Sequence, residues 1–159
     1  MRRQFGELLR KEMKENENIY LISADLGYNL WDQIKSECKD NFINPGSSEQ
    51  LMVGMAAGLA LEKKIPICYS ITPFLIYRPF EFIRNYAHHE KLPIKLVGGG
   101  RGRDYGKLGY THWAEEDREI MSVLSNVEIY YPDSKEEVVD MFREFLYNGK
   151  PSYLNLSRM

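Results

Sequence analysis

Helix-like and strand-like segments alternate along the whole chain, and this alternation restricts the fold more than any other feature of the sequence. Six segments have the apolar, β-branched or aromatic character of strands, and they read IYLIS, NFIN, IPICYS, IKLVG, VEIYY and SYLNL. Segments whose apolar residues recur at helical spacing precede or separate most of these strand-like segments. Such alternation predicts an α/β fold, with a single doubly wound, mainly parallel sheet and helices on both faces. We expect one domain over residues 1–159, without repeats or linkers.

Composition narrows the classes of partner that the chain can have. The chain has 43% hydrophobic residues, 28% charged residues and a net charge of −2, so no general attraction to nucleic acid or to an anionic membrane is expected. No apolar run approaches the roughly 20 residues that a membrane span needs, and the N-terminus lacks the apolar centre of a signal peptide. Cys38 and Cys68 have no metal-binding spacing, which favours a reduced, cytoplasmic compartment.

Four loops that follow predicted strands are expected to share one edge of the sheet, because ligands of such folds bind beyond the carboxyl ends of the strands. These loops read ADLGYN, NPGSSE, SITPFLIY and GGGRGRDYGKLGYTHW. The last is rich in glycine, but it fits neither the G-x-G-x-x-G pattern nor a Walker loop. We therefore expect a flexible loop that shapes a pocket, without a metal site in this chain.

The stretch from residue 44 to residue 61 predicts an apolar helix with one acidic residue, Glu49, at its start. A hydroxyl of Ser47 or Ser48 can cap this helix. Gly54 and Gly58 each cost roughly 1 kcal/mol relative to alanine, which indicates the close approach of another backbone. Glu49 can be interpreted in two ways. It is either a carboxylate that complements the helix dipole or a carboxyl group in an apolar pocket, where its pKa is raised.

Three blocks of the sequence resemble the pyrimidine-binding domain of thiamine diphosphate enzymes of the transketolase type. They are NPGSSEQLMVGMAAGLAL, then IPICYSITPFLIYRPFEFIRN, then GYTH, and they keep the order of the family over nearly the whole chain. The resemblance implies the thiamine diphosphate-binding fold. It also implies that Glu49 bonds to the ring nitrogen N1′ of the aminopyrimidine, and that Ser48 is among the residues near the cofactor.

The same resemblance implies roles for aromatic and acidic residues in two of the loops. An aromatic residue after the third strand stacks on the pyrimidine, and Phe74, placed in the loop before a helix that starts at Pro79, is preferred over Tyr77. Phe80 is expected to pack in the core. Asp25 matches an aspartate that lies beside the cofactor across the subunit interface, although a loop aspartate bonded to local amides is an equally available interpretation.

Substrate contacts are implied for a second set of residues. The histidine of G-x-T-H, His112, faces the reactive carbon and the substrate oxygens in the family, as a donor or proton shuttle. Arg2 or Arg3, Arg158 and Asn29 complete the expected substrate contacts. Two departures leave the substrate open, because Leu108 and Gly100 stand where transketolases of sugar phosphates have an acidic residue and a histidine. His88 and His89 are assigned a structural or solvent role.

No G-D-G motif occurs in the sequence, although the family uses one to hold Mg²⁺ and the diphosphate. The sequence therefore predicts half of a site, on the pyrimidine-binding subunit of a split, transketolase-like enzyme without the final transketolase domain. A separate G-D-G-containing chain would hold Mg²⁺ and the diphosphate, in a heterotetramer that acts on a ketose. The alternatives are a subunit of a two-chain 2-oxo acid decarboxylase and a non-catalytic binding or regulatory module.

Overall fold

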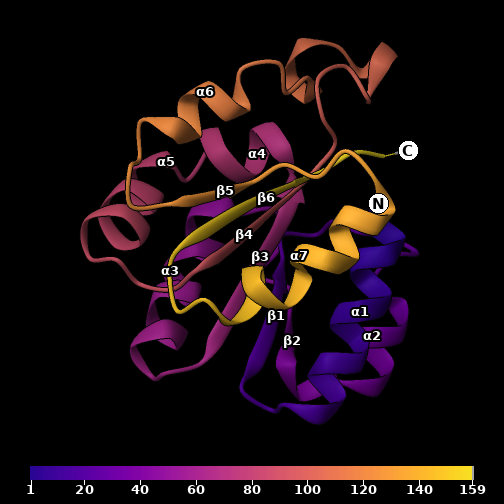
Figure 1. Cartoon of the computed structure of the whole chain (residues 1–159), viewed down its shortest axis with the longest axis vertical. Helices are drawn as coiled ribbons and strands as arrows, with labels where there is room; N and C mark the ends of the chain where they lie inside the picture. Colours follow the sequence, from indigo (N-terminus) through magenta and orange to yellow (C-terminus); the bar gives the residue numbers. More distant parts are fainter. Residues whose placement is uncertain (159) are drawn as a thin grey trace.

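The computed structural model describes residues 1–158, and a six-stranded sheet in the order β2-β1-β3-β4-β6-β5 forms its centre (Figure 1). Every pair of neighbouring strands is parallel. The predicted doubly wound parallel sheet is therefore confirmed. The strands are β1 (Ile19–Ser23), β2 (Phe42–Ile43), β3 (Ile65–Ile71), β4 (Lys95–Gly99), β5 (Glu128–Tyr130) and β6 (Ser152–Leu156).

Helices cover both faces of the sheet (Figure 1). One face carries α1 (Arg2–Glu15), α2 (Asp32–Glu37) and α7 (Lys135–Tyr147). The other face carries α3 (Glu49–Leu61), α4 (Thr72–Tyr77), α5 (Phe80–Phe82), the π-helix η2 (Ile83–His89) and α6 (Asp117–Ser122). Short 3₁₀ turns complete the connections, and they are η1 (Lys39–Asn41), η3 (Gly106–Leu108) and η4 (Tyr110–His112).

Successive residues of each central strand point into different cores. Leu21 and Ile67 belong to the core beneath α1 and α7, whereas Ile22 and Cys68 belong to the core beneath α3 and α4. Because side chains alternate along a strand, both faces need apolar residues, and this explains the continuous apolar strands of the sequence. Burial also raises the pKa of the Cys68 thiol well above its ordinary value.

The predicted helix caps have different outcomes. The Ser134 hydroxyl accepts a hydrogen bond from the Glu137 amide at 3.0 Å, as the S-x-x-E pattern predicts. Ser48 is the N-cap residue of α3, but its hydroxyl makes no capping bond, so that prediction is wrong. A Cβ atom on Gly54 would meet only the Phe82 ring at 3.5 Å, and one on Gly58 would meet nothing within 4 Å. The predicted close backbone approach is therefore wrong for both glycines.

The order of the strands reverses between β1 and β3. From β1 the chain moves outward to β2 and then returns to place β3 on the other side of β1. Such a reversal leaves a crevice at the carboxyl edge of a doubly wound sheet, which is the usual place for a ligand. The four loops that follow the predicted strands all leave the sheet at this edge, because all strands are parallel. No helix in the described part of the chain is both long and apolar enough to cross a bilayer.

Candidate functional site

Glu49 is the first residue of α3, and its side chain is only 2% exposed. The Ser70 hydroxyl on β3 donates to its Oε1 at 3.2 Å. Nη1 of Arg78 donates to both carboxylate oxygens, at 3.0 Å to Oε1 and 2.9 Å to Oε2. The carboxylate is therefore deeply buried, as one interpretation of the sequence required. The prediction of an apolar pocket around it is wrong, however, because the Arg78 guanidinium group forms an ion pair with the carboxylate.

Phe74 lies beside this ion pair, on α4 and not in a loop before the helix as predicted. The helix starts at Thr72 with Pro73 in its first turn, and Pro79 instead caps the short helix α5. The Arg78 guanidinium carbon lies 3.7 Å from the centroid of the Phe74 ring. Residues four apart on a helix share a face, so the spacing of 74 and 78 is the signal that could have identified Arg78 from the sequence. Phe80 packs against the core as predicted.

His112 is a second neighbour of Phe74. Their ring centroids are 4.9 Å apart in an edge-to-face arrangement. The Thr111 hydroxyl is within 3.0 Å of Nδ1 of His112, and the ring of Tyr105 is 5.8 Å away. The structure thus brings Glu49, Phe74 and His112 into one continuous group of contacts through Arg78.

The glycine-rich segment that carries His112 is held by its own hydrogen bonds. Gly102 pairs with Ala114 in an antiparallel bridge, and Nε1 of Trp113 donates to the Gly106 carbonyl at 3.0 Å. The side chain of Arg101 fixes its base by bonds to Asn155 at 3.0 Å and to Asp133 at 2.8 Å. Through Tyr105 the segment contributes to the wall of a cavity, and these bonds connect it to itself and to the end of the sheet.

Gly100 shows why a side chain is absent where the resembled sugar-phosphate enzymes have a histidine. Its φ angle is +101°, which L side chains rarely adopt. A Cβ atom at this position would lie 2.3 Å from the Tyr105 ring. Tyr105, which no sequence motif singled out, therefore fills the space beside the strand end.

A cavity of about 680 Å³ opens at the crevice between β1 and β3. Four cationic side chains line it, those of Arg2, Arg3, Lys135 and Arg158, together with the amides of Gln4 and Asn29 and one carboxylate, that of Glu7. The Arg158 guanidinium lies 4.5 Å from the Tyr105 ring centroid, and Tyr105 in turn lies beside His112. Among the described residues, Nε of Arg2 is buried without a hydrogen-bond partner. The predicted substrate residues Arg2, Asn29 and Arg158 thus share one largely cationic cavity, and Tyr105, which also lines it, connects it to His112.

Asp25 and Tyr77 lie outside this group of contacts. Asp25 is exposed, with a φ of +52°, and its amide donates to Oδ1 of Asn44 at 3.0 Å. Asn44 also donates to Oδ1 of Asp25 at 3.3 Å, so the carboxylate is bonded to a neighbouring loop instead of to local amides, and it stays exposed at the edge of the sheet. Tyr77 lies on α4 beside Glu116 and Asp117, and burial with these carboxylates raises the pKa of Tyr77 to about 12.

A buried polar network holds together the elements that carry the site residues. The Asp117 carboxylate accepts hydrogen bonds from Tyr153 at 2.5 Å, from Asn155 at 2.9 Å and from Tyr131 at 3.2 Å. Asn155 and Thr72 both donate to the Gly100 carbonyl, at 3.2 and 2.6 Å. Burial raises the pKa of Asp117, although its hydrogen bonds oppose this shift. The network joins β6, α4, α6 and the start of the glycine-rich segment.

These features define a doubly wound α/β domain whose polar side chains gather at the carboxyl edge of the sheet, around a buried carboxylate and a cationic crevice. The family model for the transketolase pyrimidine-binding domain matches residues 1–159. The chain therefore belongs to the transketolase pyrimidine-binding domain family, and the family predicted by the three sequence blocks is confirmed.

Relatives and solved structures agree with this assignment. A protein of Methanocaldococcus jannaschii that carries the name transketolase C-terminal section is 33% identical over 99% of this chain and 50% of its own length. One of the subunits of the apulose-4-phosphate transketolase of Actinobacillus succinogenes is 33% identical over 76% of this chain and 39% of its own length. The solved inactive beta4 tetramer of a split gene transketolase has a TM-score of 0.86 and 29% identity, over 99% of this chain and 50% of that chain. The chain thus spans about half the length or less of these relatives.

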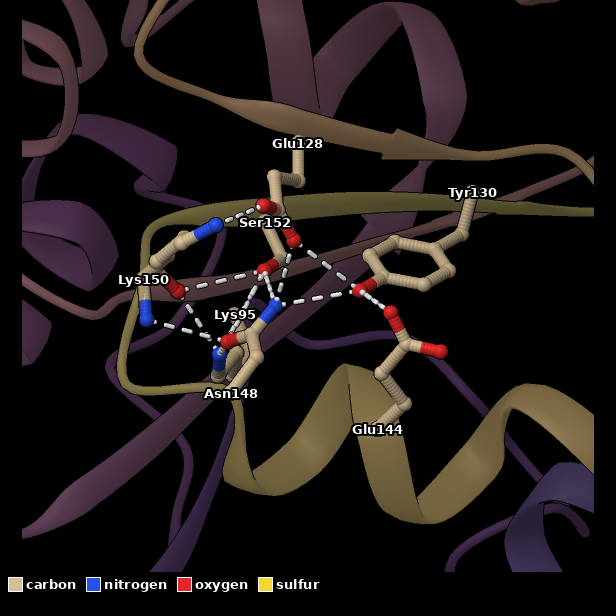
Figure 2. Close-up of polar contacts among 7 residues, drawn as sticks. All are labelled: Lys95, Glu128, Tyr130, Glu144, Asn148, Lys150 and Ser152. Atoms are coloured by element: carbon tan, nitrogen blue, oxygen red, sulfur yellow. Dashed lines mark hydrogen bonds and ion pairs between the residues drawn. The ribbon is translucent and has the colours of Figure 1, made fainter.

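A second buried polar cluster lies at the opposite, amino edge of the sheet, where β4 begins. Figure 2 shows the Lys95 ammonium group among the acceptors of Asn148, Lys150 and Ser152. Its bonds to the Lys150 carbonyl and the Ser152 hydroxyl are 2.7 and 3.3 Å long. These acceptors carry no formal charge, and burial lowers the pKa of Lys95 to about 7.

This cluster predicts a specific dependence of stability on pH. In the unfolded chain Lys95 has an ordinary pKa, so between about pH 7 and 10 the unfolded state binds more protons and stability rises with pH. Between pH 7 and 9 we expect the wild type to gain about 2 kcal/mol in free energy of unfolding relative to Lys95→Met. Urea titrations at both pH values measure this difference, with exposed Lys39→Met as the control. Equal pH dependence in wild type and Lys95→Met would contradict the assignment.

Proposed function

We propose that this chain is the pyrimidine-binding subunit of a two-chain, thiamine diphosphate-dependent transferase of the transketolase type. The observation that carries the proposal is the buried Glu49 carboxylate at the carboxyl edge, next to Phe74 and in one group of contacts with His112. The place between Glu49 and Phe74 suits a flat cofactor ring, since it already accommodates the planar guanidinium of Arg78.

Each residue of the group would have a defined role. Thiamine diphosphate, when bound, supplies the electron sink for carbon–carbon bond cleavage and transfer. Glu49 would hold a proton at the pyrimidine nitrogen N1′, and Phe74 would stack against the ring. Ser48 and Asp25, at the same edge, are further candidates for cofactor contacts. His112 would donate a hydrogen bond to the substrate oxygen and move its proton near neutral pH.

The cationic cavity supports a substrate with an anionic end. Arg2, Arg3, Lys135 and Arg158 contribute four positive charges to its wall against the single carboxylate of Glu7, and Asn29 adds an amide. Guanidinium groups bind phosphate through paired hydrogen bonds, so a phosphorylated ketose fits the charge of this cavity. The name of the related apulose-4-phosphate transketolase also points to a phosphorylated sugar.

A partner chain would complete the site. We propose that this partner carries the G-D-G motif and holds Mg²⁺ and the diphosphate, in a cytoplasmic heterotetramer with two copies of each chain. The split gene transketolase among the similar structures supports a divided enzyme.

Reconstitution tests the proposal. The chain is mixed with the G-D-G-containing chain of the same organism, thiamine diphosphate and Mg²⁺, and is then given a phosphorylated ketose with an aldose acceptor, or a 2-oxo acid. Ketol transfer from the ketose supports the proposal. Release of CO₂ from the 2-oxo acid alone would instead indicate a decarboxylase. A stable complex without turnover of either substrate would indicate a non-catalytic module.

Arg158→Ala should weaken binding of the phosphorylated donor. Loss of a charge-assisted bond in the cavity is expected to raise the KM of the phosphorylated ketose about tenfold to a hundredfold, with a smaller change in kcat. Steady-state kinetics of the reconstituted enzyme measure both constants, and Lys107→Ala, an exposed residue of η3 outside the cavity wall, is the control. An equal rise in KM for an unphosphorylated ketose would contradict a phosphate contact.

A further inference from the structure

Arg78 occupies the place that the proposed function gives to the cofactor ring. We propose that its guanidinium group is an internal stand-in for the aminopyrimidine, which closes the site in the free subunit and leaves when the ring binds. This inference rests on the proposed function, because it takes Glu49 and Phe74 as the partners of the ring.

Both of those partners are engaged by Arg78 at the same time. Nη1 of Arg78 bonds to each oxygen of Glu49, at 3.0 and 2.9 Å, so the carboxylate already has a donor. The guanidinium carbon lies 3.7 Å from the Phe74 centroid, within the range of a cation stacked on a ring face. The other ring neighbour of Phe74 is His112. A flat ring that bonds to Glu49 and stacks on the face of Phe74 that Arg78 covers must therefore replace the guanidinium group.

The guanidinium group resembles an aminopyrimidine in the properties that these two partners recognise. Both groups are planar, both present N–H donors from the edge of the plane, and both stack on aromatic rings. The guanidinium group also carries a positive charge next to the buried carboxylate. The same pair of partners can thus accept either group in turn.

The two members of the ion pair differ in how easily they can move. The Glu49 side chain is 2% exposed, whereas the Arg78 side chain is 48% exposed. Arg78 also stands at the C-cap position of α4, beyond the last turn of the helix. Of the two groups, the half-exposed guanidinium loses little on moving into water, because solvent already reaches it, and the cost of separation falls on the buried carboxylate. Arg78 is therefore the member that leaves.

The carboxylate determines when Arg78 can leave. A buried carboxylate without a partner is costly, so Glu49 favours states in which a donor faces it. The arginine thus keeps the empty site neutral, and the incoming ring restores a hydrogen bond as it takes the place of the arginine. A site that is open for only a fraction of the time has its apparent affinity lowered by that fraction.

Thiamine binding to the isolated full chain tests this displacement. Thiamine carries the aminopyrimidine without the diphosphate, so neither a partner chain nor Mg²⁺ is required. We expect Arg78→Ala to bind thiamine about tenfold more tightly than the wild type by calorimetry, as for a site open one tenth of the time. Exposed Arg84→Ala, from η2, is the matched control and should bind like the wild type. Equal or weaker binding to Arg78→Ala, or no binding by any variant up to the solubility of thiamine, would overturn the proposal.

Glu49→Gln in both backgrounds separates this inference from the proposed function. If displacement and the cofactor contact are both correct, the gain from Arg78→Ala disappears when Glu49→Gln is added. A gain that persists in the double variant supports displacement but overturns Glu49 as the partner of the ring. Weaker binding on Glu49→Gln, without any gain on Arg78→Ala, supports the cofactor contact and overturns displacement.

Thermal unfolding checks that the ion pair exists in solution. Arg78→Ala leaves the buried carboxylate unpaired, so its unfolding midpoint should fall by several degrees relative to Arg84→Ala. Adding Glu49→Gln to Arg78→Ala should recover part of this loss, because the neutral amide is less costly to bury. An unchanged midpoint in Arg78→Ala would show that the arginine does not occupy the site, and would also overturn the proposal.

Discussion

Glu49→Gln should lower kcat of the reconstituted two-chain enzyme by about 10²- to 10⁴-fold, the range expected for the loss of a positioned proton-transfer group. The amide has nearly the same shape as the carboxylate, and its oxygen can still accept a hydrogen bond from Arg78. It cannot exchange a proton with a ring nitrogen at neutral pH. Activity should therefore fall while the fold is retained, and single-turnover kinetics beside a thermal melt measure the two effects separately.

Glu62→Gln is the matched control for this substitution. Glu62 follows the last turn of the same helix, α3, and its side chain is exposed. It should leave kcat within about twofold of the wild type, as expected for a surface position away from the site. Full turnover in Glu49→Gln, with a correctly assembled pair of chains, would rule out the catalytic role of this carboxylate.

Asp117→Ala should cause the largest loss of stability among the proposed substitutions. It removes the acceptor of three buried hydrogen bonds, from Tyr131, Tyr153 and Asn155, and leaves their donors without that partner. We expect the free energy of unfolding to fall by about 3 kcal/mol, since each unsatisfied buried group costs about 1–3 kcal/mol. For a domain of this size the thermal midpoint should fall by roughly 10 °C.

The control for this effect is Asp140→Ala, which removes an exposed carboxylate from α7. Its effect should remain within about 0.5 kcal/mol. Urea and thermal unfolding of both variants measure the difference. If Asp117→Ala unfolds at the same urea concentration as Asp140→Ala, the network does not contribute to stability.

Much of the fold could be predicted because its signals are local. The strand that contains Ile67 and Cys68 is apolar at most positions, since each of its faces meets a different core. The helix start at Ser134 is equally readable, because the cap and its partner Glu137 lie within one turn. The helix that follows the third strand was predicted to start at Pro79, but it starts at Thr72. The prediction was too late in the chain because Pro73 fits a first helical turn as well as Pro79 does.

The site was only partly predictable, because its contacts join distant parts of the chain. Glu49, Phe74 and His112 could each be selected from short motifs, and the structure brings them together. The four-residue spacing indicates that Arg78 lies beside Phe74, but its ion pair with Glu49 could not be predicted, since the two residues lie 29 positions apart in the sequence. Likewise, the packing of Tyr105 against Gly100 depends on a positive φ angle that the sequence does not display.

The different anchorage of Glu49 and His112 has a consequence for how such proteins diversify. Glu49 begins a helix that packs directly on the central sheet, so altering its surroundings disturbs the core. His112 belongs to a segment that closes on itself through the pairing of Gly102 with Ala114. Under the proposed function, insertions and exchanges within this glycine-rich and aromatic segment would alter the surroundings of His112 and so the substrates that reach it, while the surroundings of Glu49 stay constant. If the chain acts as proposed, replacement of this segment as one unit is the most direct route to a new substrate specificity in protein engineering.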